Sequence, residues 1–306
     1  MKKVSLFYPG FVRKAITFTI DDGNMKYDAM LLDILKPAGI KGTFNLCSNL
    51  HEGREEETRE FYRGYDIANH CKYHPLVNCR DDLIVSEDTF DEKTADAKFL
   101  YKVDGKEEFY WQMQPNGWRQ MVFEDDYIRF VDEGLSELTA IFGQGAVRDF
   151  VWPYREMAND KVKEYVKKTH RSVRKTGCTL DSTGFAIPSD KYAWSYNANH
   201  INLLEVMEKY ESYPDDGALK FFAFGVHSID FERDDKWGDL SVFAEKYGNR
   251  PDTYWYASVG EIFDYEEALS SLVITDTRIE NPSNTAVYLS VNENQVLLNP
   301  KDSIEI

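Results

Sequence analysis

Two neighbouring carboxylates, Asp21 and Asp22, follow the β-branched and aromatic run Ala15–Ile20 and precede Gly23. Adjacent side chains at the end of a strand point in different directions, so the two carboxylates can take different roles. One can bind a metal ion while the other accepts a proton as a general base. An Asp-Asp-Gly sequence after a strand is more often only a turn, and the motif alone does not separate the two interpretations.

Three of the six histidines occupy comparable positions. His70 and His74 are four residues apart, and if this segment is helical their imidazoles lie on one face. With Asp22 they supply three ligands, which leaves positions for water and substrate on a hydrolytic zinc or similar ion. His227 ends the apolar run Phe221–Val226, and α/β barrels carry catalytic groups at such strand ends. Each histidine alone is more often a surface or core residue, but their coincidence favours a metal-dependent hydrolase.

The elements that position these residues alternate between strands and helices. Helices are indicated by apolar residues at helical spacing, as at Met30, Leu31 and Ile34. The order strand, helix, strand is typical of a parallel α/β unit. The predicted strands are 15–20, 43–46, 65–69, 149–152, 171–174 and 221–226. The predicted helices are 25–38, 55–63, 123–142 and 161–170.

Two segments interrupt this alternation. Residues 85–122 are predicted to be an insertion with a β-hairpin, because Asp104-Gly105 separates two runs rich in aromatic and β-branched residues. Residues 271–306 are predicted to form a short C-terminal β extension packed on the barrel, too small to fold alone. The remaining residues, 1–270, are predicted to form one catalytic domain.

Four motifs of the chain resemble those of the polysaccharide deacetylases of carbohydrate esterase family 4, the NodB-homology group. In order, they are Thr19–Gly23, His70–His74, Trp152–Tyr154 and Gly225–Ser228. The resemblance spans about residues 14–269 and implies a distorted (β/α) barrel of about seven strands. It also implies a divalent metal, with zinc as the first choice and cobalt, nickel or manganese as alternatives. The substrates implied are N-acetylated glycans, such as chitin oligomers or peptidoglycan, and for some members O-acetyl xylan.

The resemblance also implies a role for each residue that matches a motif. Asp21 corresponds to the general base and His227 to the general acid. Tyr154 corresponds to the residue whose backbone amide helps to hold the oxyanion. The implied metal ligands are Asp22, His70 and His74. These roles agree with the chemistry of the residues, and a histidine is expected to titrate near neutrality.

The chain departs from the family pattern at several positions. Val151 stands where the family usually has an arginine, and Arg174 is our candidate for pairing with Asp21 in its place; an ordinary surface arginine is the alternative. Cys71 follows the first metal histidine, where the family has Ser or Thr, and is predicted to serve in packing.

The family's motif with an aspartate near a tryptophan has no clear counterpart in this sequence. Asp190 with Trp194 is a loose match, and Asp181 competes with Asp190.

Composition excludes some classes of partner. The net charge of −17 argues against nucleic acid and against an anionic membrane surface. No stretch approaches the roughly 20 apolar residues of a membrane span, and the first residues lack the apolar run of a signal peptide. The chain is therefore predicted to be cytoplasmic. Its four cysteines show no CxxC spacing. Nothing in the sequence indicates an oligomeric state.

The function predicted from these features is removal of acetyl groups from an N-acetylated carbohydrate. An O-acetyl esterase and a small-molecule amidase are alternatives, because the same metal site can cleave either bond. A non-catalytic carbohydrate-binding protein is a third alternative. Metal content separates this last alternative from the enzymes, since a binding module has no need of stoichiometric zinc.

Overall fold

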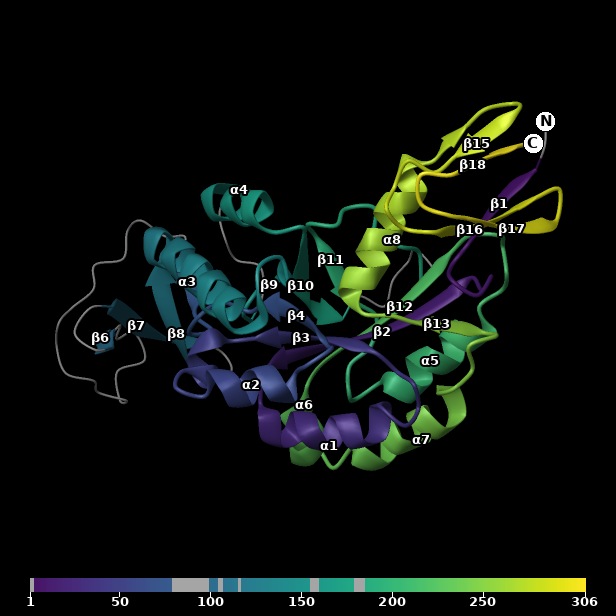
Figure 1. The fold of residues 1–306 in the computed structure, drawn as a ribbon. Helices are drawn as coiled ribbons and strands as arrows, with labels where there is room; N and C mark the ends of the chain where they lie inside the picture. Colours follow the sequence, from purple (N-terminus) through teal and green to yellow (C-terminus); the bar gives the residue numbers. More distant parts are fainter. Residues whose placement is uncertain (1–2, 79–98, 104–106, 115–116, 155–159, 179–184) are drawn as a thin grey trace.

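The computed structural model describes residues 3–78, 99–103, 107–114, 117–154, 160–178 and 185–306. Its centre is a sheet in which all of the neighbouring strands run parallel (Figure 1). The strands are β2 (Lys14–Asp22), β3 (Gly42–Leu46), β4 (Asp66–Asn69), β9 (Val147–Val151), β10 (Ser172–Cys178), β11 (Trp194–Tyr196), β12 (Lys220–His227) and β13 (Tyr254–Tyr256).

The sheet closes on itself. The strand order is β11-β10-β9-β4-β3-β2-β12, and β13 pairs with the first part of β2. Just after β11, Ala198 forms a parallel bridge with Phe224 of β12, and its carbonyl accepts a hydrogen bond of 3.0 Å from the Gly225 N–H. The two ends of the seven-strand series therefore meet. The predicted distorted (β/α) barrel of about seven strands is confirmed.

Helices cover the outside of this barrel (Figure 1). The helices predicted before residue 171 are present with ends shifted by up to three residues, whereas those after residue 200 were not foreseen. Among the described helices, none combines the length and apolar character of a membrane span. The helices are α1 (Met25–Leu35), the 3₁₀ helix η1 (Ser48–His51), α2 (Glu55–Phe61), α3 (Glu124–Phe142), α4 (Asp160–Thr169), α5 (Leu203–Ser212), α6 (Ser228–Arg233), α7 (Trp237–Tyr247) and α8 (Val259–Ser271).

Aromatic side chains fill the space between the barrel and its helices. The Phe18 ring lies 4.6 Å from the Phe224 ring and 5.5 Å from the Phe243 ring, measured between centroids. All three are fully buried, and burial of one such side chain contributes about 1.5–3 kcal/mol. In β2 seven consecutive residues are buried, as expected for a parallel strand covered on both faces. This packing holds the ends of the strands rigidly.

Strands were also predicted within the insertion, and they are present. The strands β6 (Phe99–Val103), β7 (Glu107–Gln114) and β8 (Gly117–Phe123) pair antiparallel in sequence order. The strand β5 (Leu76–Asn78), which follows His74, pairs parallel with β8. Residues 85–98 and the expected turn at Asp104-Gly105 lie outside the described residues.

The C-terminal strands form two small antiparallel sheets after α8. One contains β14 (Val273–Ile274), β15 (Arg278–Glu280) and β18 (Ser303–Glu305), and the other contains β1 (Val4–Phe7), β16 (Val287–Val291) and β17 (Asn294–Leu298). The sequence did not indicate that β1, from the start of the chain, would pair with β16. Tyr265 of α8 connects the helix to the sheet of β1 and β16. Its hydroxyl donates a hydrogen bond to the Phe7 carbonyl (2.6 Å) and accepts one from the Tyr288 N–H (3.0 Å). The domain boundary at about residue 270 remains a prediction.

Candidate metal centre and active site

Parallel pairing brings the polar residues of several strands to one edge of the barrel. Asp21 is in register with His227 of β12 on one side and with Asn45 of β3 on the other. Further along the sheet, Arg174 of β10 is in register with Val151 of β9. Asp21, Asn45, Val151 and His227 lie at the carboxyl ends of their strands, which is where barrels of this class carry their chemistry, whereas Arg174 lies in the first half of β10.

His70 and His74 are brought together by a loop rather than by a helix. The segment after β4 contains no helical turn, and Cys71 and His74 have positive φ values of 68° and 54°. The segment is therefore not helical, which was the condition for placing both imidazoles on one helix face, but the two rings still lie edge to face with centroids 4.7 Å apart. Two left-handed residues are thus part of the loop that brings His74 close to His70.

Asp22 lies between these two histidines. Its Oδ1 atom is 3.5 Å from His70 Nε2 and 3.5 Å from His74 Nε2. Ligand atoms of a tetrahedral zinc site with bonds of about 2.0–2.2 Å lie roughly 3.4 Å apart, so these spacings suit one small cation. Asp22 has a φ of 78°, a left-handed conformation that aspartate tolerates better than most residues.

Unpartnered buried atoms support a cation at this point. Asp22 Oδ1 and His70 Nε2 are both buried and have no hydrogen-bond partner within the described part of the chain. Such atoms are costly unless something satisfies them. The other ring nitrogen of His70, Nδ1, donates to the Val151 carbonyl at 2.8 Å, which leaves the lone pair of Nε2 facing Asp22. The donor set of one carboxylate and two imidazoles suits zinc and similar divalent ions.

The protonation states of Asp22 and His74 are also those of metal ligands. Burial opposes ionisation of Asp22, but His70, His227 and His74 outweigh it and hold the pKa of this carboxyl well below its usual range. Burial lowers the pKa of His74 to about 4, with a smaller contribution from the neighbouring His70. At neutral pH the carboxylate is therefore charged and the His74 imidazole neutral, as metal binding requires.

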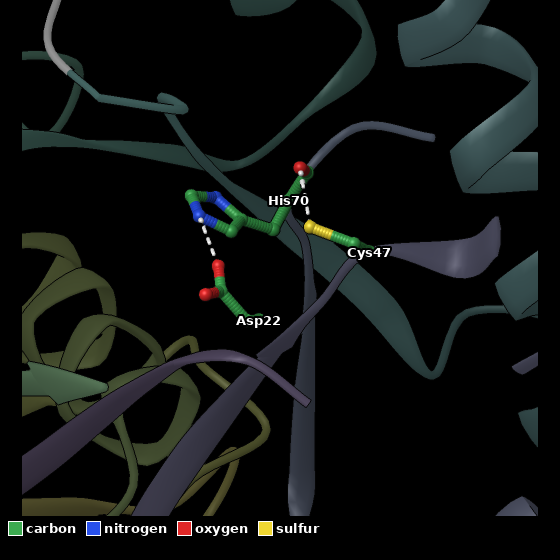
Figure 2. A group of neighbouring side chains, drawn as sticks. All are labelled: Asp22, Cys47 and His70. Carbon is green, nitrogen blue, oxygen red and sulfur yellow. Dashed lines mark hydrogen bonds and ion pairs between the residues drawn. The ribbon is translucent and has the colours of Figure 1, made fainter. Parts of the chain in front are cut away.

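Cys47 is a third possible donor beside Asp22 and His70, and the sequence did not single it out. One potential ligand atom from each of these residues lies within 4.8 Å of the others. Figure 2 shows the Cys47 sulfur directed at the His70 carbonyl oxygen, to which it donates a hydrogen bond of 3.4 Å. Burial raises the pKa of this thiol well above its ordinary value. We therefore favour His74 over Cys47 as the third ligand.

Asp21 is held by two buried donors. Its Oδ1 accepts a hydrogen bond of 2.7 Å from Asn45 Nδ2 and a short one from Arg174 Nη2. Burial opposes ionisation of this carboxyl, but Arg174, and less strongly His70 and His227, hold its pKa below the ordinary value. Both bonds end on Oδ1, so Oδ2 is the oxygen that can accept a proton from water.

His227 lies near the second oxygen of the Asp22 carboxylate, whereas His70 and His74 lie near the first. Its Nε2 is 3.9 Å from Asp22 Oδ2, and its Nδ1 is 3.0 Å from Asp230 Oδ2. Asp230 is itself held by Arg233 at 2.8 Å and lies 3.7 Å from His200 Nδ1.

The carboxylates around His227 set its protonation state. Burial favours the neutral ring, but the hydrogen bond to Asp230 and the charges of Asp22, Asp21 and Asp230 outweigh this effect and raise the pKa of His227 to about 9. The imidazole thus titrates well above neutrality, contrary to the expectation from sequence. The ring is therefore protonated at neutral pH and can donate a proton.

A family profile matches the part of the chain that carries both aspartates and both loop histidines. The profile of the polysaccharide deacetylases matches residues 10–174, which is just over half of the chain. The chain belongs to the polysaccharide deacetylase family. This membership supports a carbohydrate deacetylase, which is a hydrolase, and it includes the segment that carries both aspartates and both loop histidines. A search of the curated proteins found no match.

Solved structures with a similar fold include several deacetylases. The peptidoglycan deacetylase PdaC from Bacillus subtilis is 13% identical, with a TM-score of 0.46 over 85% of this chain and 94% of that chain. The polysaccharide deacetylase Bc1974 from Bacillus cereus is 15% identical, with a TM-score of 0.43 over 80% and 92%. The Xyl-CE4 domain of a multidomain xylanase from the hindgut metagenome of Trinervitermes trinervoides is 14% identical, with a TM-score of 0.45 over 84% and 92%.

Arg174 lies beside Val151, the position where an arginine was expected from the resemblance. Because the two residues are in register on neighbouring strands, a long side chain from Arg174 starts at the same level of the barrel. Its guanidinium is fully buried, contacts Asp21 and lies 5.3 Å from the centroid of the Tyr196 ring. The structure thus places Arg174 against Asp21 and not at the surface. Arg171, three residues earlier, pairs instead with Asp149 and Asp264.

Replacing Arg174 by alanine is expected to shift the pH dependence of the deacetylase activity. Without the guanidinium the pKa of Asp21 rises, and since the base must be ionised, the acidic limb of the pH profile of kcat/KM moves to higher pH. Stability is expected to fall by about 3–5 kcal/mol in urea unfolding, because a buried carboxylate loses its partner.

The variant Arg174→Lys provides a milder form of this test. It keeps the charge but not the paired N–H groups, so it is expected to move the acidic limb less than Arg174→Ala. An acidic limb that stays in place in both folded variants would refute the pairing role.

Replacing Asp230 by asparagine is expected to shift the alkaline limb of the pH profile of kcat/KM. The pKa of His227 falls when this carboxylate is removed, and because only the protonated ring can donate a proton, the alkaline limb moves to lower pH. Asp234→Asn is the matched control, because Asp234 contacts His200 at 2.6 Å and Arg233 at 3.1 Å but makes no contact with His227 among the described residues. Equal shifts in the two variants would rule out a specific role for Asp230.

Tyr154 lies beside the metal centre in a strained backbone conformation. Its φ is 58°, which is rare for a bulky residue, and its ring packs edge-on against His74 with centroids 4.4 Å apart. Cys71 is fully buried in the cluster that contains Phe130, as expected for a packing residue. The role of the Tyr154 backbone amide remains a prediction.

The expected Asp–Trp motif is absent from the site as far as the structure describes it. Asp190 is exposed and accepts from the Tyr192 N–H at 2.8 Å, while Trp194 is buried in the core. Asp181 lies outside the described residues. The carboxylate that contacts His227 is Asp230.

Sequence reasoning missed Asp230, Asn45 and Cys47. Asp230 has a local signal, because it follows His227 by three residues at the start of α6. Asn45 has no local signal in the sequence, because only the parallel register of β2 with β3 places it beside Asp21.

Proposed function

We propose that the chain is a metal-dependent hydrolase that removes the acetyl group from an N-acetylated carbohydrate. Asp22, His70 and His74 would hold a divalent cation, with zinc as the first choice. When bound, this cation would polarise the acetyl carbonyl and make a water molecule more acidic.

Asp21 acts as the general base in this proposal. Its ionised carboxylate accepts a proton from the attacking water while Arg174 and Asn45 keep it in one orientation. The fixed orientation matters, because a base must lie within hydrogen-bond reach of the proton that it removes. The backbone amide of Tyr154 is proposed to donate to the developing oxyanion.

His227 acts as the general acid. The protonated ring donates its Nε2 proton to the nitrogen of the sugar as the bond between that nitrogen and the acetyl carbon breaks. Asp230, bonded to Nδ1, keeps Nε2 directed toward Asp22 and stabilises the charged ring. The products are acetate and the free amino sugar.

One observation carries this proposal most directly. One oxygen of the Asp22 carboxylate lies 3.5 Å from each of two imidazole nitrogens, and its other oxygen lies 3.9 Å from the imidazole of His227. The neighbouring carboxylate, Asp21, is held by a buried arginine. Proton acceptor, proton donor and cation ligands therefore surround one small volume at the strand ends. A carbohydrate-binding protein has no need for this arrangement.

The proposal is tested by measuring acetate release together with metal content. Purified protein is loaded with zinc, cobalt, nickel or manganese and assayed on chitin oligomers, peptidoglycan fragments, O-acetyl xylan and simple acetamides. Release of acetate from N-acetylated sugars with one metal per chain is the expected result. Preference for O-acetyl xylan would indicate the esterase, and preference for simple acetamides would indicate the amidase. Sugar binding without acetate release or stoichiometric metal would indicate a non-catalytic protein.

A further inference from the structure

A cavity of about 340 Å³ lies beside the proposed base and acid. Asp21 and His227 line one part of it, and Lys26, His51 and Arg54 line another. Its volume is at the lower end for small-molecule sites and suits a single sugar unit. Lys26, His51 and Arg54 have no part in the reaction as proposed. The question is therefore which part of a substrate they could bind.

Lys26 places a positive charge where the fold already supplies one. It is the second residue of α1, and the N-terminus of a helix carries partial positive charge that disfavours a lysine. The N-cap residue Asn24 makes no capping hydrogen bond with its side chain. Within the described residues, Lys26 Nζ contacts only Tyr27, at 3.4 Å from its hydroxyl, and pairs with no carboxylate. An anion at this helix end would interact favourably with both charges.

Arg54 adds a second cation to the rim. Its Nε and Nη2 atoms donate to Glu57 at 2.9 and 3.0 Å. This pair is exposed, so it is screened by water and only partly compensates the charge of the guanidinium. Arg54 is therefore held in place but can still attract a second anion.

His51 is the independent indication of a ligand. Its side chain is buried, with a relative exposure of 1%, yet Nε2 has no hydrogen-bond partner in the part of the chain that is described. Its Nδ1 atom lies 3.2 Å from the Thr58 hydroxyl. If that hydroxyl donates to Nδ1, Nε2 carries the proton and is a donor. A Cβ atom at Gly23 would lie 2.6 Å from Nε2, so this nitrogen is adjacent to the turn that bears Asp21 and Asp22.

The two aspartates of the cavity do not cancel these positive groups. Arg174 already compensates Asp21, and Asp22 lies 3.9 Å from the protonated ring of His227 and would hold the proposed cation. The cavity therefore contains one cation, Lys26, that no carboxylate pairs with among the described residues. We propose that it binds an anionic substituent, a carboxylate or a phosphate, on the sugar that carries the acetamide. This inference rests on the proposed function and narrows its substrate class.

The test compares neutral and anionic sugars in matched variants. Acetate release is measured for N-acetylglucosamine, N-acetylmuramic acid and N-acetylglucosamine 6-phosphate with the metal-loaded protein, Lys26→Gln and Lys36→Gln. Lys36, at the other end of α1, is exposed and gives the same change in net charge. We expect Lys26→Gln to lower kcat/KM about tenfold for an anionic sugar, through KM, because one charge-assisted hydrogen bond of about 1.5 kcal/mol is lost. For the neutral sugar with Lys26→Gln, and for every sugar with Lys36→Gln, kcat/KM is expected to change less than twofold.

The outcomes separate this inference from the proposed function. A Lys26-dependent preference for muramic acid would identify a carboxylate ligand, and one for the 6-phosphate would identify a phosphate; either supports the inference. Equal use of all three sugars, or a preference that persists in Lys26→Gln, would overturn it while leaving the deacetylase proposal intact. Calorimetric binding of the same sugars to the Asp21→Asn protein provides a readout that does not depend on turnover. If no acetate is released from any sugar, the proposed function fails, and the binding data alone then decide the inference.

Discussion

Replacement of His70 by alanine is expected to abolish stoichiometric metal binding and to reduce deacetylation by at least about 10³-fold. The metal is proposed to contribute several kcal/mol of charge stabilisation in the transition state, and each 1.4 kcal/mol corresponds to a factor of ten. His70 is fully buried, and its Nε2 faces the Asp22 oxygen at 3.5 Å, so water cannot readily replace it as a ligand.

Three measurements test whether His70→Ala loses its metal. Inductively coupled plasma mass spectrometry gives metal per chain, and a chelator should reduce the unmodified protein to the activity of His70→Ala. Zinc should also raise the melting temperature of the unmodified protein but not of the variant, because a ligand stabilises only the state that binds it.

The control for His70→Ala is Cys47→Ala, which tests the alternative donor set. The Cys47 sulfur donates to the His70 carbonyl at 3.4 Å, so we expect this variant to keep its metal and most of its activity. His74→Ala is expected to lose metal. If Cys47→Ala loses the metal and His74→Ala retains it, the third ligand is Cys47 and the assignment of His74 is wrong.

Replacement of Asp21 by asparagine is expected to leave metal content unchanged and to reduce turnover by about 10²- to 10⁴-fold, the usual contribution of a positioned base. Asparagine keeps an oxygen that can accept from Asn45 and Arg174, so the local hydrogen bonds can persist. It cannot take a proton from water at neutral pH. The loss should therefore occur in kcat, with substrate affinity largely retained.

The matched control for Asp21→Asn is Asp33→Asn, which makes the same chemical change at an exposed position on α1. Its activity should stay within about twofold of the unmodified protein. Loss of metal from Asp21→Asn, with retention in Asp22→Asn, would mean that the roles of the two aspartates are exchanged. Thermal unfolding of Asp21→Asn shows whether loss of the negative charge opposite the buried Arg174 has destabilised the fold.

Several features of this protein could be predicted from local sequence because they depend on neighbours along the chain. The apolar run Ala15–Ile20 and the helical spacing after it indicate a parallel α/β unit, since periodicity reports which faces are buried. The motifs that contain Asp22, His70 and His74 could be recognised from the types and spacing of their residues and from their resemblance to the family. Their local conformation could not, because the left-handed φ values of Asp22 and His74 depend on the turns that join them to the barrel.

The tertiary structure alone decided which residues surround the proposed reaction centre. By itself, the sequence determined the residue types, their order and the parallel α/β architecture. It gave Arg174 only as a candidate partner for Asp21, 153 positions away, with a surface arginine as the alternative, and it did not indicate that Asn45 lies opposite Asp21 on the next strand. Both contacts arise from strand order and register, which are set by the packing of the whole barrel. The protonation state of His227 follows in the same way, because its pKa depends on the carboxylates that folding gathers around it.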